Sequence, residues 1–190
     1  MKLTPFLLPL AASLLTMATF PALAQQKLMP AQSEISFVFK QMGVPVEGHF
    51  KKFDAQVAFD AAKLPTNKVA FTVDIASATL GSRETDAELP KADWFNTARF
   101  PQATFASSGF KALGGGKYEV AGKLSIKGQS RDVVVPVTMT QSGAVTTAVG
   151  SFPIKRLVFR IGENDWADTS MVADDVQVKF KLALSGVGKL

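Results

Sequence analysis

The chain has 190 residues, a formal net charge of +5, 47% hydrophobic residues, a single His and no Cys. This length fits one globular domain with a sizeable core, and without Cys the domain must be stable without disulfides. One His and no Cys exclude a zinc site of the usual type, and the modest charge argues against nucleic-acid recognition.

Residues 1–24 have the features of a secretory signal peptide. Lys2 gives a positive start, an apolar run follows from Phe6 to Thr19, and Ala22-Leu23-Ala24 is a small-residue cleavage site. The run is interrupted by prolines and is too short for a membrane anchor. Cleavage lowers the Lys and Arg count from 21 to 20 against 16 Asp and Glu, a net charge of +4. We therefore predict an exported protein whose mature domain occupies residues 25–190.

Alternation of apolar and polar residues dominates the rest of the chain, which is typical of strands with one buried face. The clearest segments are 35–40, 69–75, 118–127, 133–139 and 176–182. Weaker strands are expected at 44–59, 103–110, 144–152 and 154–161, with Gly-containing turns between strands. Because each of the eight or nine strands is apolar on one face only, they must enclose a shared interior, as a sandwich or a barrel.

Residues 84–96 break this alternation. Leu89, Trp94 and Phe95 stand among acids without a period of two, which predicts one or two short helical turns interrupted at Pro90. Two placements stay open: the insert caps one end of a barrel, or it lies on the outer surface.

Candidate catalytic groups are sparse. His49 is expected to be an exposed strand residue, because it lies on the opposite alternation face from Phe50. The acids of the insert, Glu84, Asp86, Glu88 and Asp93, could supply a carboxylate pair, but the simpler interpretation is a solvated face. Residues 163–168 could surround a calcium ion, yet they lack the spacing of a twelve-residue calcium loop, so a polar turn is expected.

The chain is rich in phenylalanine, with 15 Phe in all, of which 13 follow residue 24. Most of them fall on the apolar faces of the expected strands. The interior of an eight-stranded barrel is just wide enough to be filled by side chains or to hold one small ligand. Both a filled core and a ligand pocket therefore stay open.

A series of short motifs runs from Ser33 to Leu184. In order, they are Ser33-x-Ile35-x-Phe37, Met42-Gly43-Val44, Gly48-x-Phe50-x-x-Phe53, Phe59-Asp60, Asp86-x-x-Leu89, Asp93-Trp94-Phe95-Asn96, Phe100-Pro101-x-Ala103-Thr104-Phe105, Gly122-x-Leu124-Ser125-Ile126-Lys127-Gly128, Phe152-Pro153-Ile154-Lys155-Arg156 and Trp166-x-Asp168. Their order and spacing resemble the YceI-like family, the lipocalin-like polyisoprenoid-binding proteins of bacterial periplasms. Gln41 and Thr85 depart from the family pattern, where His and Arg are common.

The resemblance implies an all-β fold: an eight-stranded antiparallel up-and-down, lipocalin-like barrel with a short helical insert. It implies a periplasmic protein that binds an isoprenoid-type lipid, polyprenyl or quinone-like. No further cofactor, no metal and no catalysis are expected, because residues suited to catalysis or metal binding are sparse. A homodimer and transient contact with a membrane surface are further expectations. The expected ligand-binding residues face the barrel interior or lie near the insert: Phe37, Phe39, Phe71, Val73, Phe95, Phe105, Leu124, Ile126, Val137 and Phe180.

The head-group contact and two other functions stay open. Lys155 or Arg156 could meet a polar head group at the mouth of the pocket, although surface charge is the simpler interpretation for both. A filled barrel would indicate an interaction or stress-response module. An enzyme that acts on isoprenoid lipids through the acids of residues 84–93 is the third alternative.

Overall fold

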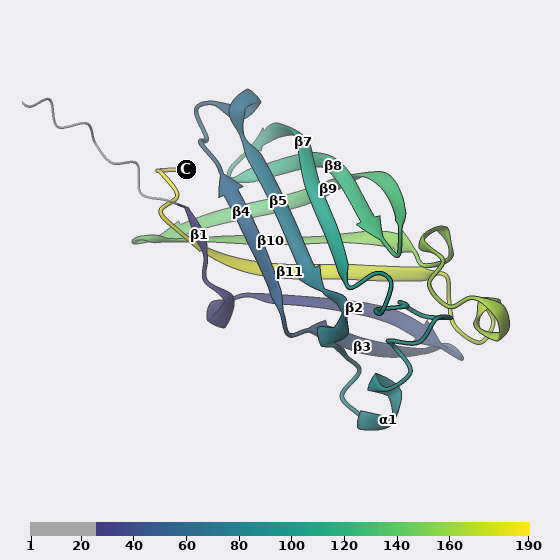
Figure 1. Cartoon of the computed structure of the whole chain (residues 1–190). Helices are drawn as coiled ribbons and strands as arrows, with labels where there is room; N and C mark the ends of the chain where they lie inside the picture. The colour runs from purple at the N-terminus through teal and green to yellow at the C-terminus, as the bar shows by residue number, and fades with distance from the viewer. Residues whose placement is uncertain (1–25) are drawn as a thin grey trace, which may run out of the picture.

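The computed structural model describes residues 26–190, which form one antiparallel sheet (Figure 1). The predicted signal peptide, residues 1–24, lies outside the described residues. The strands are β1 (Lys27–Leu28), β2 (Glu34–Gln41), β3 (Val44–Phe50), β4 (Phe53–Ala58), β5 (Lys68–Asp74), β6 (Ala78–Thr79), β7 (Gln102–Gly114), β8 (Lys117–Ile126), β9 (Gln129–Ser142), β10 (Val145–Lys155) and β11 (Asp175–Ser185). The helical elements are α1 (Arg83–Asp86) and the 3₁₀ turns η1 (Pro30–Gln32), η2 (Leu64–Thr66), η3 (Ile75–Ser77), η4 (Leu157–Phe159) and η5 (Asn164–Ala167).

The sheet closes into a barrel of eight strands when β3 and β4 are counted as one and the two-residue strands β1 and β6 are left out. β3 and β4 are two halves of one bent strand, since β3 pairs with β2 and β6 while β4 continues the same course against β5. At the bend, Lys51 N donates to Ser77 O at 3.2 Å and Asp74 N donates to Lys52 O at 3.0 Å. Each following strand pairs with the next, and β11 returns to β2. The predicted eight-stranded antiparallel up-and-down barrel is therefore confirmed.

A two-residue strand near the start of the described chain reinforces the wall. Lys27 of β1 pairs with Gln56 of β4 and with Ser185 of β11, so β1 joins two strands that do not otherwise pair. The Gln26 amide also bonds both backbone groups of Phe59, donating to its oxygen at 2.7 Å and accepting from its nitrogen at 2.8 Å. Because β1 is so short, these side-chain bonds help to hold it in place.

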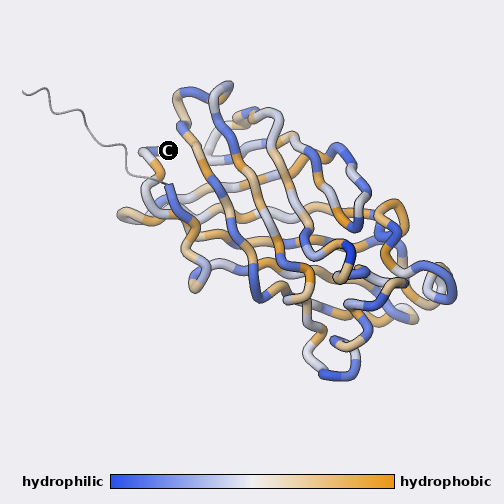
Figure 2. Tube along the Cα trace, viewed as in Figure 1, coloured by the Kyte–Doolittle hydropathy of each residue, from blue (hydrophilic) through white to orange (hydrophobic). Residues whose placement is uncertain are grey.

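The apolar residues alternate along the strands, as Figure 2 shows, and their inward faces form two core clusters. The cluster at the end that carries the β7–β8 and β9–β10 hairpins contains Phe59, Tyr118, Met139, Ala148, Leu184 and Val187. The larger cluster lines the middle and the opposite end. In the part of the chain that the structure describes, no helix is long and apolar enough to cross a membrane.

The helical insert caps the barrel end opposite those hairpins. Leu89 and Phe95 are only 7% and 8% exposed and pack in one cluster with Leu124 and Ile126 of β8. Placement of the insert on the outer surface is therefore wrong. Only α1 is helical, and the rest of the insert is a series of turns around Pro90.

The strand expected at 154–161 is also wrong. β10 ends at Lys155, and the chain then turns through η4 to Arg160, which has a left-handed φ of 59°. The segment alternates apolar and polar residues but does not form a strand. The buried Arg156 side chain bonds to the loop and holds this segment in a turn.

Candidate ligand-binding site

Two apolar cavities lie end to end inside the barrel. The first, of about 180 Å³, is nearer the β7–β8 hairpin, and the second, of about 210 Å³, is nearer the insert. They share six lining residues: Ile35, Val73, Ala103, Leu124, Phe152 and Val178. The interior is thus elongated and hollow, which contradicts the filled-barrel alternative.

All ten expected ligand-binding residues line these cavities. Phe71, Phe105, Val137 and Phe180 line the first; Phe37, Phe39, Phe95 and Ile126 line the second; Val73 and Leu124 line both. The fold therefore gathers ten residues from six strands and the insert around the two adjoining cavities. Their contact with a ligand stays a prediction.

Sequence reasoning missed other lining residues, among them Ile35, Phe50, Phe59, Phe110, Tyr118 and Phe152. The signal for several was present, because Ile35 shares its alternation face with Phe37 and Tyr118 shares its face with Leu124. Phe59 also shares its face with Val57, although it lies just beyond the end of β4.

Three strand glycines explain how so many phenylalanines leave room along the axis. A Cβ on Gly48 would overlap the Phe37 ring, one on Gly122 would overlap the Phe105 ring, and one on Gly150 would overlap the Phe180 ring. Each ring therefore lies over a glycine of the neighbouring strand and packs against the wall. Aromatic side chains that cover strand glycines in this way stabilise a sheet. Here the arrangement also keeps the rings away from the centre of the barrel.

Arg156 is almost fully buried, with 2% of its surface exposed, although it lines the second cavity. The guanidinium donates all five N–H groups to backbone carbonyls of the loop that follows β10: Nε to Ala173 (3.1 Å), Nη1 to Ile161 (2.9 Å) and Gly162 (3.0 Å), and Nη2 to Trp166 (2.7 Å) and Val172 (2.7 Å). Burial lowers the pKa of Arg156 from its ordinary value. The expectation of a surface charge is wrong for Arg156, because the irregular loop needs its donors. Lys155, in contrast, is exposed and pairs with Asp175 at 2.7 Å.

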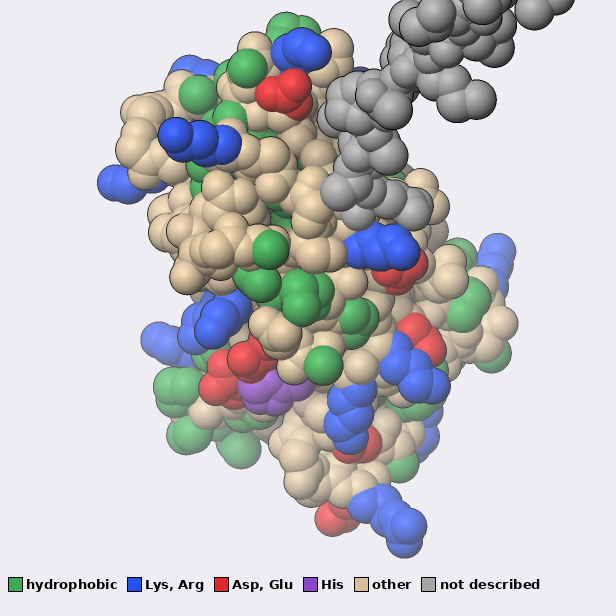
Figure 3. All heavy atoms as spheres, turned by 90° about the vertical axis from the view of Figure 1, so that its left-hand side faces the viewer, with side chains coloured by type: hydrophobic (Ala, Val, Ile, Leu, Met, Phe, Trp, Pro, Cys, Tyr) green, Lys and Arg blue, Asp and Glu red, His purple; other side chains and the backbone are tan. Residues whose placement is uncertain are grey.

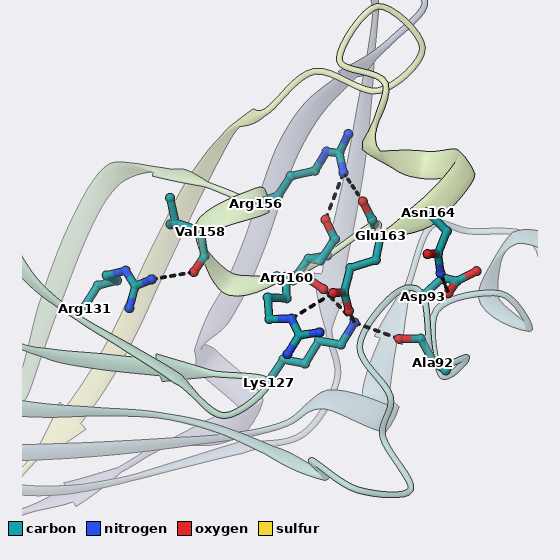
Figure 4. A network of polar contacts seen from close by, with 11 residues as sticks. Ala92, Asp93, Lys127, Arg131, Arg156, Val158, Arg160, Glu163 and Asn164 are labelled. Carbon is teal, nitrogen blue, oxygen red and sulfur yellow. Dashed lines mark hydrogen bonds and ion pairs between the residues drawn. The ribbon is translucent and has the colours of Figure 1, made fainter.

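Lys127 ties three segments of the capped end together (Figure 4). Its side chain is 4% exposed, and Nζ donates to Ala92 O at 2.7 Å, to Arg160 O at 2.6 Å and to Glu163 Oε2 at 3.0 Å. The Arg160 Nε donates to the other Glu163 oxygen at 2.8 Å. The hydrogen bonds from Lys127 and Arg160 hold the pKa of Glu163 below its usual range.

Several of the acids considered for calcium or catalysis have structural partners. Both Glu163 oxygens bond to cations, and the described residues contain no group of three or more His, Cys, Asp or Glu placed to hold a metal. Asp86 accepts from Thr79 Oγ1 and from Leu80 N, both at 2.6 Å, and these bonds lower its pKa. Asp93 accepts from Asn164 Nδ2 at 2.6 Å. These contacts link Asp86 and Asp93 to the structure of the cap.

Two further candidate residues, Glu88 and His49, also have charged neighbours. Glu88 lines the second cavity and bonds Lys91 at 2.5 Å. His49 is half-exposed on the outer face of β3 and lies 3.1 Å from Glu34, which agrees with the expectation of an exposed strand residue.

A closed antiparallel barrel with an elongated apolar interior and a capped end defines the class of this protein: a lipocalin-like β-barrel. A model of the YceI-like domain matches residues 26–184, and the chain belongs to that family.

Relatives and solved structures agree with this assignment. A UPF0312 protein of Azotobacter vinelandii is 33% identical over 110 residues, a match that covers 57% of each chain. A UPF0312 protein of Photorhabdus laumondii is 34% identical over 136 residues, 70% of each chain. The matched part of the chain thus spans little more than half the length of the Azotobacter relative.

Among solved structures, Burkholderia cenocepacia BcnA is 49% identical, with a TM-score of 0.80 over 82% of this chain and 98% of that chain. A polyisoprenoid binding domain of Saccharophagus degradans, implicated in plant cell wall breakdown, has a TM-score of 0.68 over 85% of this chain and 98% of that chain. At 15% identity, the Saccharophagus domain supports the fold alone.

Proposed function

We propose that this protein is a periplasmic carrier that holds a long isoprenoid-type lipid, polyprenyl or quinone-like, along the barrel axis. The observation that carries the proposal is the pair of apolar cavities that meet at six shared residues. The polyisoprenoid-binding domain of Saccharophagus degradans has the same fold, and the predicted leader supports an exported protein.

The cavity sizes favour an elongated guest. An apolar cavity of about 150 Å³ holds a molecule the size of benzene, so each cavity here is large enough for one small ring or a short piece of chain. Each buried methylene contributes about 0.8 kcal/mol, while binding costs roughly 4 to 15 kcal/mol in lost freedom. A ligand held firmly must therefore bury more than about ten carbons, which requires both cavities.

The two cavities differ in polarity, which favours one orientation of the guest. The first is lined by apolar side chains except for Thr104 and Tyr118. The second also has Gln41, Thr85 and Glu88 at its lining. We therefore place the hydrocarbon tail in the first cavity and a polar head group in the second.

The lipid content of the native protein tests the proposal. The protein is purified from the periplasm of an expressing bacterium, and organic extracts are analysed by mass spectrometry. Wild-type protein should contain a polyprenyl or quinone-like lipid in near-stoichiometric amount. Absence of any lipid, together with no uptake of an added polyprenyl probe, would rule the carrier out.

A matched pair of variants on β7 locates the lipid. Ala103 is buried where the two cavities meet, whereas Ala106 lies on the same strand and faces solvent. Ala103→Leu should reduce bound lipid several-fold, because the larger side chain narrows the interior at its middle. Ala106→Leu should leave the lipid content unchanged. Equal lipid in the two variants would place the lipid elsewhere.

A further inference from the structure

The two ends of the barrel differ in charge. The end that carries the hairpins is built from residues 26–33, 59–68, 110–118, 140–146 and 185–190. These segments contain six lysines, all exposed: Lys27, Lys63, Lys68, Lys111, Lys117 and Lys189. Asp60 is the only acidic side chain in them. At the capped end, residues 40–44, 75–101, 127–131 and 155–175 contain nine Lys or Arg and nine Asp or Glu, so the formal charges of that end cancel.

We call the lysine-rich end the basic end. Figure 3 views the side of the molecule where the C-terminus lies, and blue lysine and arginine side chains are scattered over this face. Two of its lysines have acidic neighbours, but only in exposed pairs: Lys63 with Asp60 at 3.9 Å and Lys111 with Glu119 at 3.1 Å. Exposed pairs of this kind are weak, so most of the positive charge stays available to an anionic surface.

An apolar residue stands among these lysines. Leu113 is 50% exposed at the tip of the β7–β8 hairpin, between Lys111 and Lys117. The strand pairing skips Leu113, since Ala112 pairs with Tyr118 and Gly114 with Lys117. A bulge of this kind redirects a side chain, and here it leaves Leu113 out of the sheet. The glycines that follow, Gly114 and Gly115, have open space around them.

The basic end also lies next to the proposed ligand. Phe59, Phe110, Tyr118 and Leu184 line the first cavity and come from this end of the barrel. A long apolar lipid has almost no solubility in water, so it must be taken from and given to a membrane. Clustered lysines around an exposed apolar side chain combine the two attractions that bring a protein to an anionic bilayer.

We propose that the basic end is a docking face for an anionic phospholipid membrane, with Leu113 entering the interface and the lysines contacting the head groups. The proposal rests on the proposed function, because it names the surface at which the carried lipid is exchanged. Acidic proteins and nucleic acids are the other anionic partners, and the test below distinguishes them from a bilayer.

Vesicle flotation tests this face. Protein purified from the periplasm is mixed with vesicles of phosphatidylcholine alone or with about one third phosphatidylglycerol, at low and high salt. Binding should require the anionic lipid and weaken as salt screens the charges. Each lysine near an anionic bilayer contributes about a factor of five in affinity, so Lys111→Gln with Lys117→Gln should weaken binding roughly tenfold or more.

Two variants complete the test. Lys40→Gln with Arg83→Gln removes the same charge from exposed positions outside the basic end and should leave binding within about twofold of wild type. Leu113→Ser should weaken binding to anionic vesicles although it leaves every lysine of the basic end in place. Equal losses in the two charge variants, no preference for anionic vesicles, or tighter binding to polyglutamate or duplex DNA than to anionic vesicles would overturn the docking face.

Lipid content separates this proposal from the carrier function. Wild-type protein that contains the isoprenoid lipid but ignores anionic vesicles leaves the carrier intact and removes the docking face. Vesicle binding through Lys111, Leu113 and Lys117 by a protein that contains no lipid and takes up no polyprenyl probe supports the docking face and removes the carrier.

Discussion

The two ends of the barrel are closed by different physical means. At the basic end, tight hairpins satisfy their own backbone hydrogen bonds, and an apolar cluster around Phe59 and Tyr118 seals the interior. At the capped end, irregular loops leave carbonyls without partners in the sheet, and the buried cations Arg156 and Lys127 bond them. The backbone groups of a long irregular loop do not pair with a neighbouring strand. When such a loop is buried at the end of a barrel, side chains must supply the hydrogen bonds, because a buried polar group without a partner is costly.

The largest effect is expected at the capped end. Arg156→Met removes five hydrogen bonds from buried carbonyls and should lower the free energy of unfolding by about 4 to 5 kcal/mol. Arg156→Lys should also be less stable than wild type, since an ammonium group has three donors in place of five. Urea unfolding measures both, and Arg160→Met, at an exposed position, is the control, with a loss near 0.5 kcal/mol. A loss for Arg156→Met as small as the control would show that the loop does not depend on the guanidinium.

The apolar seal gives the next effect. Phe59 is 4% exposed and contacts the rings of Phe110 and Tyr118 at centroid distances of 6.0 and 5.3 Å. Phe59→Ala should cost about 3 to 4 kcal/mol through lost burial and a new cavity. Hydrogen exchange sharpens the comparison: Arg156→Met should expose amides of residues 157–174, while Phe59→Ala should lower protection along the barrel strands. The same exchange pattern in both variants would contradict a difference between the ends.

A smaller effect is expected where the aromatic lining meets the wall. Gly48→Ala should push Phe37 and Leu80 toward the second cavity, cost about 1 to 2 kcal/mol and reduce bound lipid. Gly109→Ala is the matched control, because a Cβ there meets no atom within 4 Å, and it should be nearly neutral. Thermal unfolding and lipid mass spectrometry measure the two properties. If both variants keep full lipid content, the glycine contacts do not set the room available to the guest.

The smallest effect is a pH dependence of the capped end. Bonds from Lys127 and Arg160 lower the pKa of Glu163 below the ordinary value of 4.5. The carboxylate therefore stabilises the fold fully above pH 4.5, and this contribution is lost as the pH falls through the lower pKa of the folded state. The melting temperature of wild type should exceed that of Glu163→Gln at pH 6, and the difference should shrink below pH 4.5. A constant difference from pH 6 to pH 3 would contradict this linkage, and Asp165→Asn, at an exposed neighbour, is the control.

Much of the fold and of the candidate site could be predicted because alternation is a local property. Phe37, Phe71 and Phe180 could be placed on inward faces from their own neighbours, and closure of the sheet then brought them to one hollow. The strand expected at 154–161 failed for the opposite reason. Arg156 stands in an alternating pattern, yet its partners are backbone carbonyls up to 17 residues away, and no local pattern reveals them.

The sequence by itself determined most of the strands, the inward faces, the interrupted insert and the family likeness, because each depends on residue types and their spacing along the chain. Only the tertiary structure decided that the interior is hollow, that the insert closes one end and that Arg156 and Lys127 are buried. These features depend on where rings and cations meet strands and loops distant in sequence. The charge difference between the ends likewise depends on the closed barrel, because closure places some turns at one end and the others at the opposite end.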